Sequence, residues 1–526
     1  MTSATLASPM DHAHHEPLTV LSKTAPVHFI GVGGIGMSGL AKILLESGYT
    51  VTGSDLRSND ETKRLHAMGA TIHTGHSSEN LPINATVVLS TAVSPNNPEW
   101  LTAQELGLPC VHRSELLRWI LESPEFGHTL SVGISGSHGK TSTTGMTACG
   151  LAGGGLFPTA IAGGLFPASL ASSLTNAVTS TTKTVAVAEL DESDGSLLAY
   201  TPDISVLLNL EMDHAEHFPE GIEGLRNVIH TFVEHLATQA TAERPKSLLL
   251  NVADPELLLM LPAWQKLALN NPAFRLVGFH NPFGSGDLAL KTLGHPIAGL
   301  PVYTLTEVAE DSPARYRGVV NLGKDSVATL SMTAPGKHQL VNGMVALAIA
   351  HQLKQQGQFL DLAKAAEGIS DFTGMGRRFE VVGRWNGATL VDDYAHHPTE
   401  VAAMVTVGKS VLGNKGSIIG VFQPHRYTRL REFWEPFAES LLGLDEIIIT
   451  DVYEASEPPI EGITGEAFTQ VVREKLQALG QASKPVSYVP RSQWNTLITD
   501  LKSRLTPYDW VMSIGAGDIT ALLRGW

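Results

Sequence analysis

The chain has 526 residues, enough for about three domains at roughly 150 residues each. It is 43% apolar, and 36 Lys and Arg residues against 52 Asp and Glu residues give it a net charge of −16. This acidic balance argues against a nucleic-acid binder and against a partner for anionic membranes, because both functions need a basic face.

The two cysteines, Cys110 and Cys149, match no metal-ligand spacing and are too few for a disulfide framework, which indicates a reducing compartment. Residues 1–26 lack a basic start and a long apolar run, so they are interpreted as a disordered tail and not as a signal peptide. Residues 141–182 carry no charge, but their Gly, Pro, Ser and Thr favour a buried helix followed by Gly-rich loops over a membrane span. The sequence therefore predicts a cytoplasmic protein without membrane insertion.

Strand-like apolar runs alternate with helical segments along most of the chain, which is typical of α/β domains with parallel sheets. The first series predicts strands at 26–30, 49–55 and 86–93 and helices near 37–47 and at 114–123. The second series predicts strands at 129–135, 184–192, 204–213, 247–255 and 274–279, a hairpin over 318–332 and a long helix over 337–357. Segment 280–316 has weak periodicity and is interpreted as an insertion.

A third series begins near residue 372 and repeats a strand followed by a helix, with strands at 388–395, 417–425, 446–452, 485–489 and 509–517. The three series predict an α/β chain with an N-terminal Rossmann-like domain, a central parallel sheet of the P-loop ATPase type and a C-terminal Rossmann-like domain. We expect the tail and the domains to occupy residues 1–26, 27–122, 123–374 and 375–526.

The sharpest chemical signal is GISGSHGKTSTT (133–144), between an apolar strand and a helix. Glycines let backbone N–H groups surround phosphate oxygens, and the start of the helix adds positive potential. Lys140 would then reach the β- and γ-phosphates, and the Thr141 hydroxyl would bind Mg²⁺. The spacing departs from the standard Walker A motif at Ile134, so a Gly-rich turn without a nucleotide is the alternative.

Polar residues gather where two predicted strands of the second series end. The first of these strands ends at Glu189, and His214 follows the second. Ligands of open α/β sheets bind at the carboxyl ends of strands, and Mg²⁺ prefers hard oxygen ligands. We therefore favour Glu189 and His214 as metal ligands. The neighbouring acids Asp191, Glu192, Asp194, Glu211 and Asp213 are interpreted as helix caps or solvent-facing groups.

A third signal, Gly31, Gly33 and Gly36 in GVGGIGMSGLA (31–41), forms GxGxxG directly after a strand, and Asp55 ends the next strand. This pattern fits a dinucleotide-binding turn whose acid reaches a ribose, but it does not distinguish NAD from a nucleotide-sugar.

A fourth signal lies in DDYAHHP (392–398) and FQPHRYTR (422–429), each at the end of a predicted strand. The planar forks of Arg426 and Arg429 suit a carboxylate or a phosphate. Together with His396 and His425 they predict a shared anion site.

These motifs, in this order, resemble the Mur ligase family of peptidoglycan synthesis. The resemblance covers nearly the whole chain beyond residue 27 and rests on HFIGVGGIGMSGLA (28–41), GSHGKTSTT (136–144), ELDESDGSLL (189–198), NLEMDHAEHF (209–218), PGKHQLVNGMVALA (335–348), GMGRRFE (374–380), VDDYAHHPTEV (391–401) and FQPHRYTRL (422–430). This chain departs from the family by its N-terminal tail, by Ser137 and Ser142 where threonine is common, and by extra length near 280–316.

The resemblance implies that the three domains bind a UDP-sugar, ATP and an amino acid, in chain order. It implies an ATP-dependent ligase that joins L-alanine to the lactyl carboxylate of UDP-N-acetylmuramate through an acyl-phosphate. It assigns the sugar nucleotide to Gly31, Gly33, Gly34, Gly36 and Asp55, and the product carboxylates to His396, His425, Arg426 and Arg429. It assigns the ATP phosphates to Gly136, Ser137, His138, Gly139, Lys140, Thr141 and Ser142, and the base and ribose to Asn209, His338, Asn342 and Asp392. It assigns Mg²⁺ to Thr141, Glu189 and His214, and catalysis to Lys140, Glu189, His214, His396 and Arg426.

Three alternatives stay open: another ligase of the group that recycles a tripeptide or adds another amino acid, an NAD-dependent oxidoreductase, and a silent binder of a nucleotide-sugar. The oligomeric state is expected to be a monomer or a homodimer. Three bound substrates must be brought together by domain closure, so a hinge is predicted near 371–378, where glycines flank Arg377.

Overall fold

The computed structural model describes residue 18 and residues 21–123, 125–171, 175–180, 182, 184–193, 195–212, 218–283, 299–455 and 457–526. Most of the predicted tail therefore lies outside the described residues. The chain divides into two compact units. The first unit comprises Met1–Glu307, Gly318–Leu330 and Val341–Phe372, and the second comprises Val308–Arg317, Ser331–Leu340 and Thr373–Trp526.

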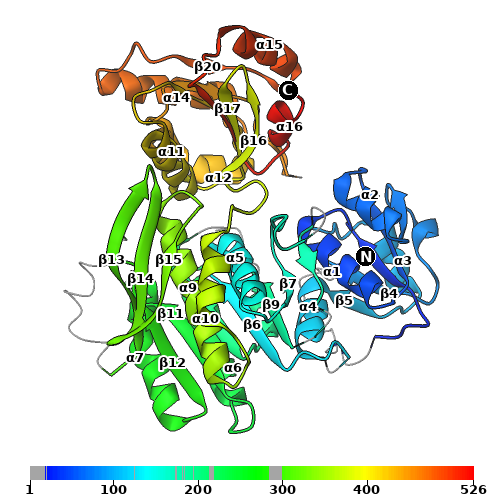
Figure 1. Cartoon of the computed structure of the whole chain (residues 1–526). Helices are drawn as coiled ribbons and strands as arrows, with labels where there is room; N and C mark the ends of the chain where they lie inside the picture. Colours follow the sequence, from blue (N-terminus) through cyan, green and yellow to red (C-terminus); the bar gives the residue numbers. More distant parts are fainter. Residues whose placement is uncertain are drawn as a thin grey trace. The chain divides into compact units, whose positions relative to one another are not determined.

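A five-stranded parallel sheet near the N-terminus has the order β3-β2-β1-β4-β5, as predicted for a Rossmann-like domain. Figure 1 draws this part of the chain in blue, with β4 and β5 labelled. Its strands are β1 (Val27–Ile30), β2 (Val51–Asp55), β3 (Thr71–Thr74), β4 (Thr86–Leu89) and β5 (Cys110–His112). Its helices are α1 (Ile35–Glu46), α2 (Asp60–Ala67), α3 (Pro98–Glu105) and α4 (Arg113–Glu122). The short strands β3 and β5 were not predicted, because β3 carries polar, partly exposed residues and β5 has only three residues.

A second sheet has the order β15-β14-β13-β12-β11-β10-β6-β9-β7-β8. The strands are β6 (Leu130–Ser135), β7 (Thr159–Ile161), β8 (Ala177–Val178), β9 (Val185–Glu189), β10 (Ile204–Leu207), β11 (Lys246–Asn251), β12 (Phe274–Phe279), β13 (Val302–Ser312), β14 (Arg315–Leu322) and β15 (Asp325–Ser331). The strands from β7 to β13 in this order are parallel, which confirms the predicted central parallel sheet.

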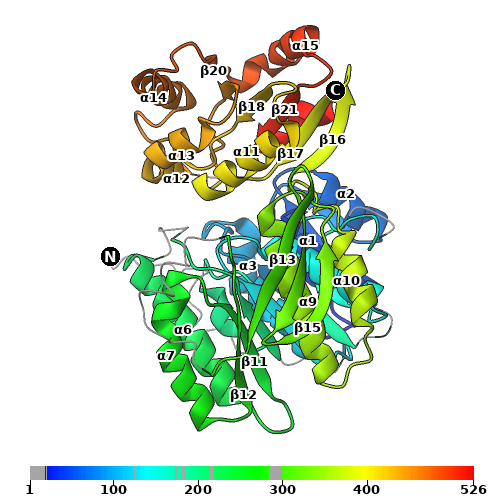
Figure 2. The same cartoon turned by 60° about the vertical axis from the view of Figure 1, so that its left-hand side comes forward.

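Helices cover both faces of the central sheet. They are α5 (Lys140–Gly153), α6 (Ile222–Gln239), α7 (Pro255–Asn270), α9 (Lys337–Gln355) and α10 (Leu362–Ser370). Side chains alternate along β11, so Leu248 and Leu250 join the core under α6 and α7, whereas the hydroxyl of Ser247 donates to Gln352 of α9 over 2.8 Å. Figure 2 shows α6 and α7 side by side.

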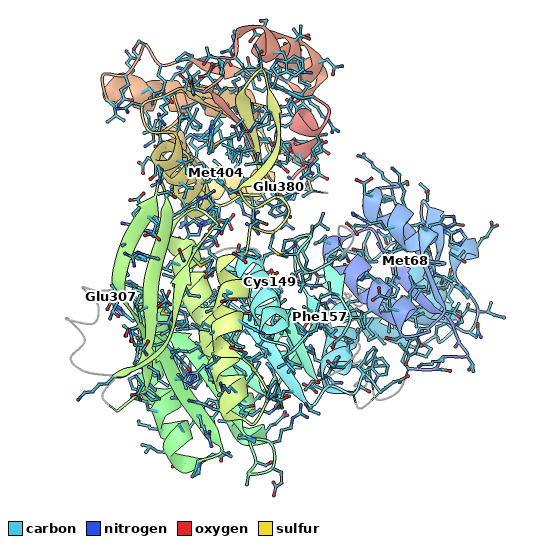
Figure 3. The ribbon with its side chains drawn as sticks, in the orientation of Figure 1. Met68, Cys149, Phe157, Glu307, Glu380 and Met404 are labelled. Atoms are coloured by element: carbon cyan, nitrogen blue, oxygen red, sulfur yellow. The ribbon has the colours of Figure 1, made fainter. Side chains whose placement is uncertain are left out.

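The uncharged stretch begins with α5, and the residues from Thr141 to Leu151 of this helix are buried. Its glycines allow α10 to approach closely, because a Cβ atom on Gly150 would lie 2.6 Å from Cγ1 of Ile369. The side chain of Cys149 lies on the same helix (Figure 3), and both cysteines are free thiols. Within the described ranges, no helix is long and apolar enough to span a membrane.

The segment interpreted as an insertion contains a long strand. Residues 284–298 lie outside the described part, but β13 pairs in parallel with β12 through Gly278 and Val302 and extends the central sheet. Val302–Ser312 of this segment therefore form a strand of the central sheet. The strand is mostly exposed and carries Glu307 at a φ of 52°, so it lacks the apolar alternation that would have identified it.

The C-terminal sheet has the order β16-β17-β21-β18-β19-β20, with β16 antiparallel and the other strands parallel. The strands are β16 (Glu380–Trp385), β17 (Ala388–Asp393), β18 (Ile418–Phe422), β19 (Glu446–Ile449), β20 (Val486–Tyr488) and β21 (Trp510–Ile514). The helices are α11 (Pro398–Leu412), α12 (Tyr427–Glu432), α13 (Trp434–Leu441), α14 (Gly465–Ala478), α15 (Trp494–Arg504) and α16 (Thr520–Arg524). Neighbouring residues such as Val391 and Leu390 belong to separate cores on the two faces of the sheet.

Candidate active site

The loop at residues 136–139 joins β6 to α5, at the carboxyl end of the central parallel sheet. Gly136 and Gly139 have φ values of 135° and 86°, which side chains disfavour, and Gly139 caps the helix. The first N–H groups of a helix lack partners within the helix and attract anions. Lys140 is the first residue of α5, so a cation stands at the start of this helix.

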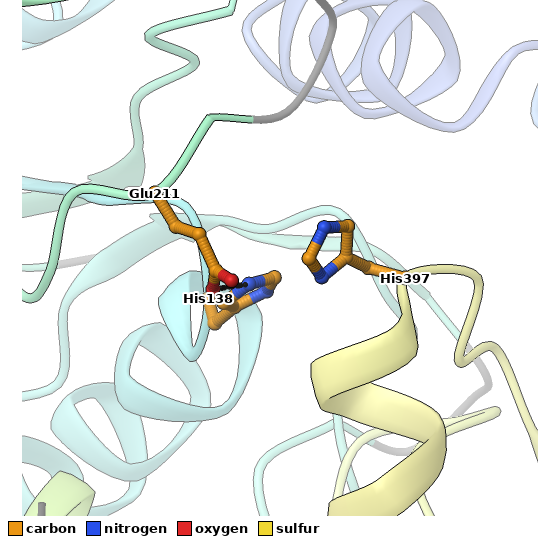
Figure 4. Close-up of side chains that lie close together, drawn as sticks. All are labelled: His138, Glu211 and His397. Atoms are coloured by element: carbon orange, nitrogen blue, oxygen red, sulfur yellow. Dashed lines mark hydrogen bonds and ion pairs between the residues drawn. The ribbon is translucent and has the colours of Figure 1, made fainter. Parts of the chain in front are cut away.

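The loop is braced from the side by the chain that follows β10. The Asn209 side chain accepts from the N–H of His138 over 2.8 Å and donates to the carbonyl of His138 over 2.9 Å. Ser137 donates its hydroxyl to the carbonyl of Glu211 over 2.8 Å, and the His138 ring lies 2.8 Å from the Glu211 carboxylate (Figure 4). The Asn209 amide thus holds the loop of residues 136–139 through its side-chain oxygen and nitrogen.

Lys140 is held by groups of its own unit. Its Nζ donates to the carbonyl of Gly136 over 2.7 Å and to the two oxygens of Glu192 over 3.1 and 2.9 Å. Burial opposes its charge, but the charges of Glu192, Asp191 and Glu189 outweigh burial and raise the pKa of Lys140 above its usual range. Burial raises the pKa of Glu192, and Lys140 counteracts this. Glu192 is therefore the internal counter-ion of the loop lysine, a role that the sequence analysis missed.

Thr141 and Glu189 meet as predicted. The Thr141 hydroxyl donates to Oε2 of Glu189 over 2.9 Å, and the same oxygen accepts from the N–H of Gly163 over 2.7 Å. A hydroxyl and a carboxylate oxygen at this distance, beside a phosphate loop, fit the hard-oxygen donor set of Mg²⁺. His214 lies outside the described residues, as do Asp194 and Asp213.

Two further predicted nucleotide residues lie on α9. Gly139 packs against Asn342, because a Cβ atom on this glycine would lie 3.2 Å from Oδ1 of Asn342. Asn342 is thereby placed beside the phosphate loop, although it is far from it in sequence. His338 is exposed and lies one turn earlier on the helix. Ser142 is buried in the first turn of α5.

The glycine turn of residues 31–36 follows β1 and leads into α1, whose N-cap is Gly34. The carboxylate of Asp55 accepts from the N–H of Gly33 over 2.9 Å, and Asn59 donates to the carbonyl of Gly33 over 3.0 Å. A Cβ atom on Gly33 would lie 2.9 Å or less from both side chains, so a larger residue there would displace them. Asp55 is thus engaged with the turn itself, in addition to any contact it makes with a ribose.

A buried polar network supports this turn from below. The carbonyl of Ser54 accepts from the N–H groups of Gly31 and Val32, and its hydroxyl donates to Oε2 of Glu99 over 2.5 Å. Oε2 of Glu99 also lies 3.1 Å from the His28 ring, and both side chains are fully buried. Burial acts to raise the pKa of Glu99, but hydrogen bonds from His28, Ser54 and Asn80 lower it to about 2. No short motif marks this network, and the sequence analysis missed it.

In the second unit, the predicted anion residues gather at the ends of β17 and β18. The rings of His396 and His425 lie 6.0 Å apart, and Nη1 of Arg429 lies 3.4 Å from Nδ1 of His425. Arg426 has a φ of 67°, donates its N–H to the carbonyl of Tyr453 over 2.8 Å and directs its guanidinium to Glu457 at 4.0 Å. A strained backbone of this kind is concentrated at functional sites.

Asp392 has a different surrounding from the one expected. Its carboxylate is fully buried and accepts from the hydroxyls of Ser513 and Thr520 over 2.7 and 2.6 Å. Arg377 and Arg524 each approach it at 3.3 Å. Both of its carboxylate oxygens are therefore engaged within the second unit. The next residue, Asp393, is also buried, and burial raises its pKa to about 6.

Comparison with known proteins agrees with this arrangement. Three family models match: "Mur ligase family, catalytic domain" over residues 26–123, "Mur ligase middle domain" over 134–350 and "Mur ligase, glutamate ligase domain" over 377–517. The UDP-N-acetylmuramate–L-alanine ligase of Pelotomaculum thermopropionicum is 35% identical over 95% of this chain and 96% of its own length. The ligase of the same name from Geotalea daltonii is 36% identical over 94% and 96%.

Solved structures of Mur ligases are also similar to this chain. The UDP-N-acetylmuramate–alanine ligase of Thermotoga maritima is 25% identical, with a TM-score of 0.72 over 95% of this chain and 97% of its own. A murein peptide ligase of Psychrobacter arcticus shares the fold, with 19% identity, a TM-score of 0.63 and coverage of 95% and 98%. The motifs, the sheets and the relatives agree along almost the whole length of the sequence, and the chain belongs to the Mur ligase family.

Proposed function

We propose that the protein catalyses the ATP-dependent ligation of L-alanine to the lactyl carboxylate of UDP-N-acetylmuramate, a step of peptidoglycan precursor synthesis. The observation that carries this proposal is the pairing of Lys140 with Glu192 beside the contact of Thr141 with Glu189, at the start of α5. The proposal is supported by relatives with this activity that are 34–36% identical over nearly the whole chain. ATP and UDP-sugars are made in the cytoplasm, so we propose that location.

The chemistry explains why a triphosphate is needed. A carboxylate does not form an amide with an amine in water, because its oxygen is a poor leaving group. A lactyl carboxylate oxygen attacks the γ-phosphorus of ATP, the bond to the ADP oxygen breaks, and an acyl-phosphate and ADP form. The amine of L-alanine then attacks the carbonyl carbon, loses a proton, and inorganic phosphate leaves. Phosphoryl transfer of this kind depends mainly on positioning and on charge neutralisation.

The residues of the phosphate loop supply that neutralisation. The N–H groups of residues 136–142 and the Lys140 ammonium would surround the ATP phosphates, as Glu192 releases the lysine to them. Thr141 and Glu189, together with His214, would hold Mg²⁺, which neutralises the triphosphate when bound. Asn342 would contact the nucleotide from α9, since it already lies against Gly139.

We assign the other substrates to the remaining clusters. The glycine turn with Gly31, Gly33, Gly34, Gly36 and Asp55 would bind the UDP-sugar. His396, His425, Arg426 and Arg429 would bind the carboxylate of the incoming amino acid, which suits two arginines beside two imidazoles. His396 and Arg426 would orient the alanine for attack.

We also propose the domain boundaries 27–122, 123–374 and 375–526 and a hinge at 371–378. The last boundary is supported by the start of the main segment of the second unit at Thr373 and by the lack of a regular element between Ser370 and Glu380. Hydrogen exchange should show slower exchange at 371–378 when all substrates are present. Equal exchange with and without substrates would contradict the hinge.

The experiment that tests the function is phosphate release from ATP with UDP-N-acetylmuramate and, separately, L-alanine, glycine, L-serine or a murein tripeptide. The expected result is phosphate release that requires both the sugar nucleotide and L-alanine. Hydroxylamine should also trap an acyl-phosphate. Release that needs no amino acid or no sugar nucleotide would overturn the proposal. Faster release with the tripeptide than with L-alanine would reassign the protein to a recycling ligase.

A further inference from the structure

Arg113 lies close to two parts of the first unit, the glycine turn and the segment that follows β9, which the proposed function does not link. It is the first residue of α4, and its Nη2 atom lies 3.1 Å from Oδ2 of Asp191, in the segment that follows β9. Its Nη1 atom lies 3.8 Å from the position that a Cβ atom on Gly36 would take. The guanidinium therefore stands between the glycine turn and the acidic segment beside Lys140.

The stability of α4 does not explain this position. A positive side chain in the first turn of a helix opposes the helix dipole, which favours acidic residues there. The ion pair with Asp191 is partly exposed, with side-chain exposures of 22% and 36%, and pairs of this kind contribute little to stability. A cation in this place therefore contributes little to the stability of α4, and it is well placed to bind an anion.

Asp191 has the properties of an internal counter-ion that a ligand can replace. Its Oδ1 atom is fixed by the N–H and the hydroxyl of Ser193, over 3.1 and 2.7 Å, so Oδ2 is the oxygen offered to Arg113. The Asp191 carboxylate is therefore the counter-charge that Arg113 faces through Oδ2.

The glycine turn and the acidic segment belong to the same unit. Helix α1 is attached to the chain around β8, because Lys42 donates to the carbonyl of Ala177 over 2.8 Å and Asn176 donates to the hydroxyl of Ser38 over 3.2 Å. Through these contacts α1, which the glycine turn opens, is fixed to β8 of the central sheet, and Asp191 follows β9 of that sheet.

We propose that Arg113 binds the anionic part of the sugar nucleotide, exchanging the Asp191 carboxylate for a substrate anion. The planar guanidinium of arginine suits both a diphosphate and a carboxylate, and UDP-N-acetylmuramate carries both groups. This inference rests on the proposed function, because it takes the glycine turn as the site of the sugar nucleotide.

The test is calorimetric binding of UDP-N-acetylmuramate to the full chain without ATP. Arg113→Gln should weaken binding about 10- to 100-fold, as expected for a lost charge-assisted hydrogen bond, and Arg113→Lys should weaken it less. Asp191→Asn removes the competing carboxylate and should bind at least as tightly as the wild type. Arg118→Gln, the control, removes an ion-paired arginine of equal exposure from the same helix and should change binding less than about twofold.

Two further ligands identify the anion. If Arg113→Gln weakens the binding of UDP, UDP-N-acetylglucosamine and UDP-N-acetylmuramate equally, Arg113 binds the diphosphate. If the substitution weakens only the binding of UDP-N-acetylmuramate, Arg113 binds the lactyl carboxylate. If Arg113→Gln binds UDP-N-acetylmuramate within about twofold of the wild type, the inference is overturned. It is also overturned if Asp191→Asn loses as much affinity as Arg113→Gln, because this result would indicate a structural ion pair. A wild-type protein that fails to bind UDP-N-acetylmuramate would instead overturn the proposed function.

Discussion

The two glycine-rich segments of the first unit, the turn of residues 31–36 and the loop of residues 136–139, have the same local architecture and different chemistry. Each follows a parallel strand and opens a helix whose N-cap is a glycine. In the turn, a carboxylate, that of Asp55, accepts from the backbone of Gly33. In the loop, the cation Lys140 is stored against Glu192.

The difference shows that a glycine-rich turn supplies N–H groups, whereas side chains from other strands decide which ligand these groups can serve. At the loop, the opposite charges of Lys140 and Glu192 neutralise each other, and a triphosphate can separate them. The turn has no lysine of its own and is supported from below by Ser54 and Glu99. We therefore expect substitutions at the loop to affect ATP binding and the chemical step, and substitutions at the turn to affect binding of the sugar nucleotide and stability.

The largest effect is expected from Lys140→Ala, because in the proposed function this cation would face the transferred phosphate. Turnover should fall about 10³-fold or more, measured as phosphate release with saturating substrates. The variant should still fold, which circular dichroism can check, since Glu192 can take up a proton when its partner is lost. Lys354→Ala removes an exposed lysine of α9 and serves as the control. A loss of less than about tenfold in Lys140→Ala would contradict the assignment of the loop.

Glu189→Gln should have the next largest effect. Removing a metal-binding charge should lower turnover about 100-fold and raise the Mg²⁺ concentration needed for half-maximal rate. Glu234→Gln is the control, because it removes an exposed carboxylate of α6 that pairs with His230 of the same helix. An unchanged Mg²⁺ requirement in Glu189→Gln would show that this carboxylate does not hold the metal.

A pair of glycine substitutions compares the two segments directly. Gly136→Ala places a Cβ atom 3.0 Å from the backbone of Asn209 at a φ that alanine disfavours, so the KM for ATP should rise about tenfold or more. Gly33→Ala pushes Asp55 and Asn59 aside and should raise the KM for the sugar nucleotide by a similar factor. If both variants affected the same substrate, the assignment of two ligands to two segments would be wrong.

The smallest effect on catalysis, but a clear one on stability, is expected from Glu99→Gln. The folded pKa of about 2 lies below the unfolded value of 4.5, so the carboxylate contributes stability that is present above pH 4.5 and lost as the pH falls toward 2. At pH 7 the variant should lose about 3 kcal/mol of unfolding free energy in urea, and the difference from the wild type should narrow below pH 4.5. Glu105→Gln, at the exposed end of the same helix, should show neither effect.

Much of the fold was predictable from sequence, because buried parallel strands are continuous apolar runs. The strands near 184–192 and 509–517 were found in this way. The hairpin at 318–332 was predicted from its turn at 323–325, and β14 and β15 are neighbours in the sheet there. Strands without that pattern were missed: β16 is an exposed edge strand, and β13 carries charged residues along an exposed ribbon. The loop of residues 136–139 between a strand and a helix followed from the motif, and Thr141 and Glu189, which the family resemblance joined in one ligand set, are in contact.

The sequence by itself determined which segments are loops that can bind phosphate, since glycine spacing and strand position depend on local backbone geometry. Only the tertiary structure decided which partners these segments have. It placed Glu192 on Lys140, buried Asp392 under Ser513 and Thr520, and turned the Asn209 amide toward His138. Each of these contacts joins residues that are far apart in the chain, and the position of such partners depends on how strands and helices pack, not on the order of residues.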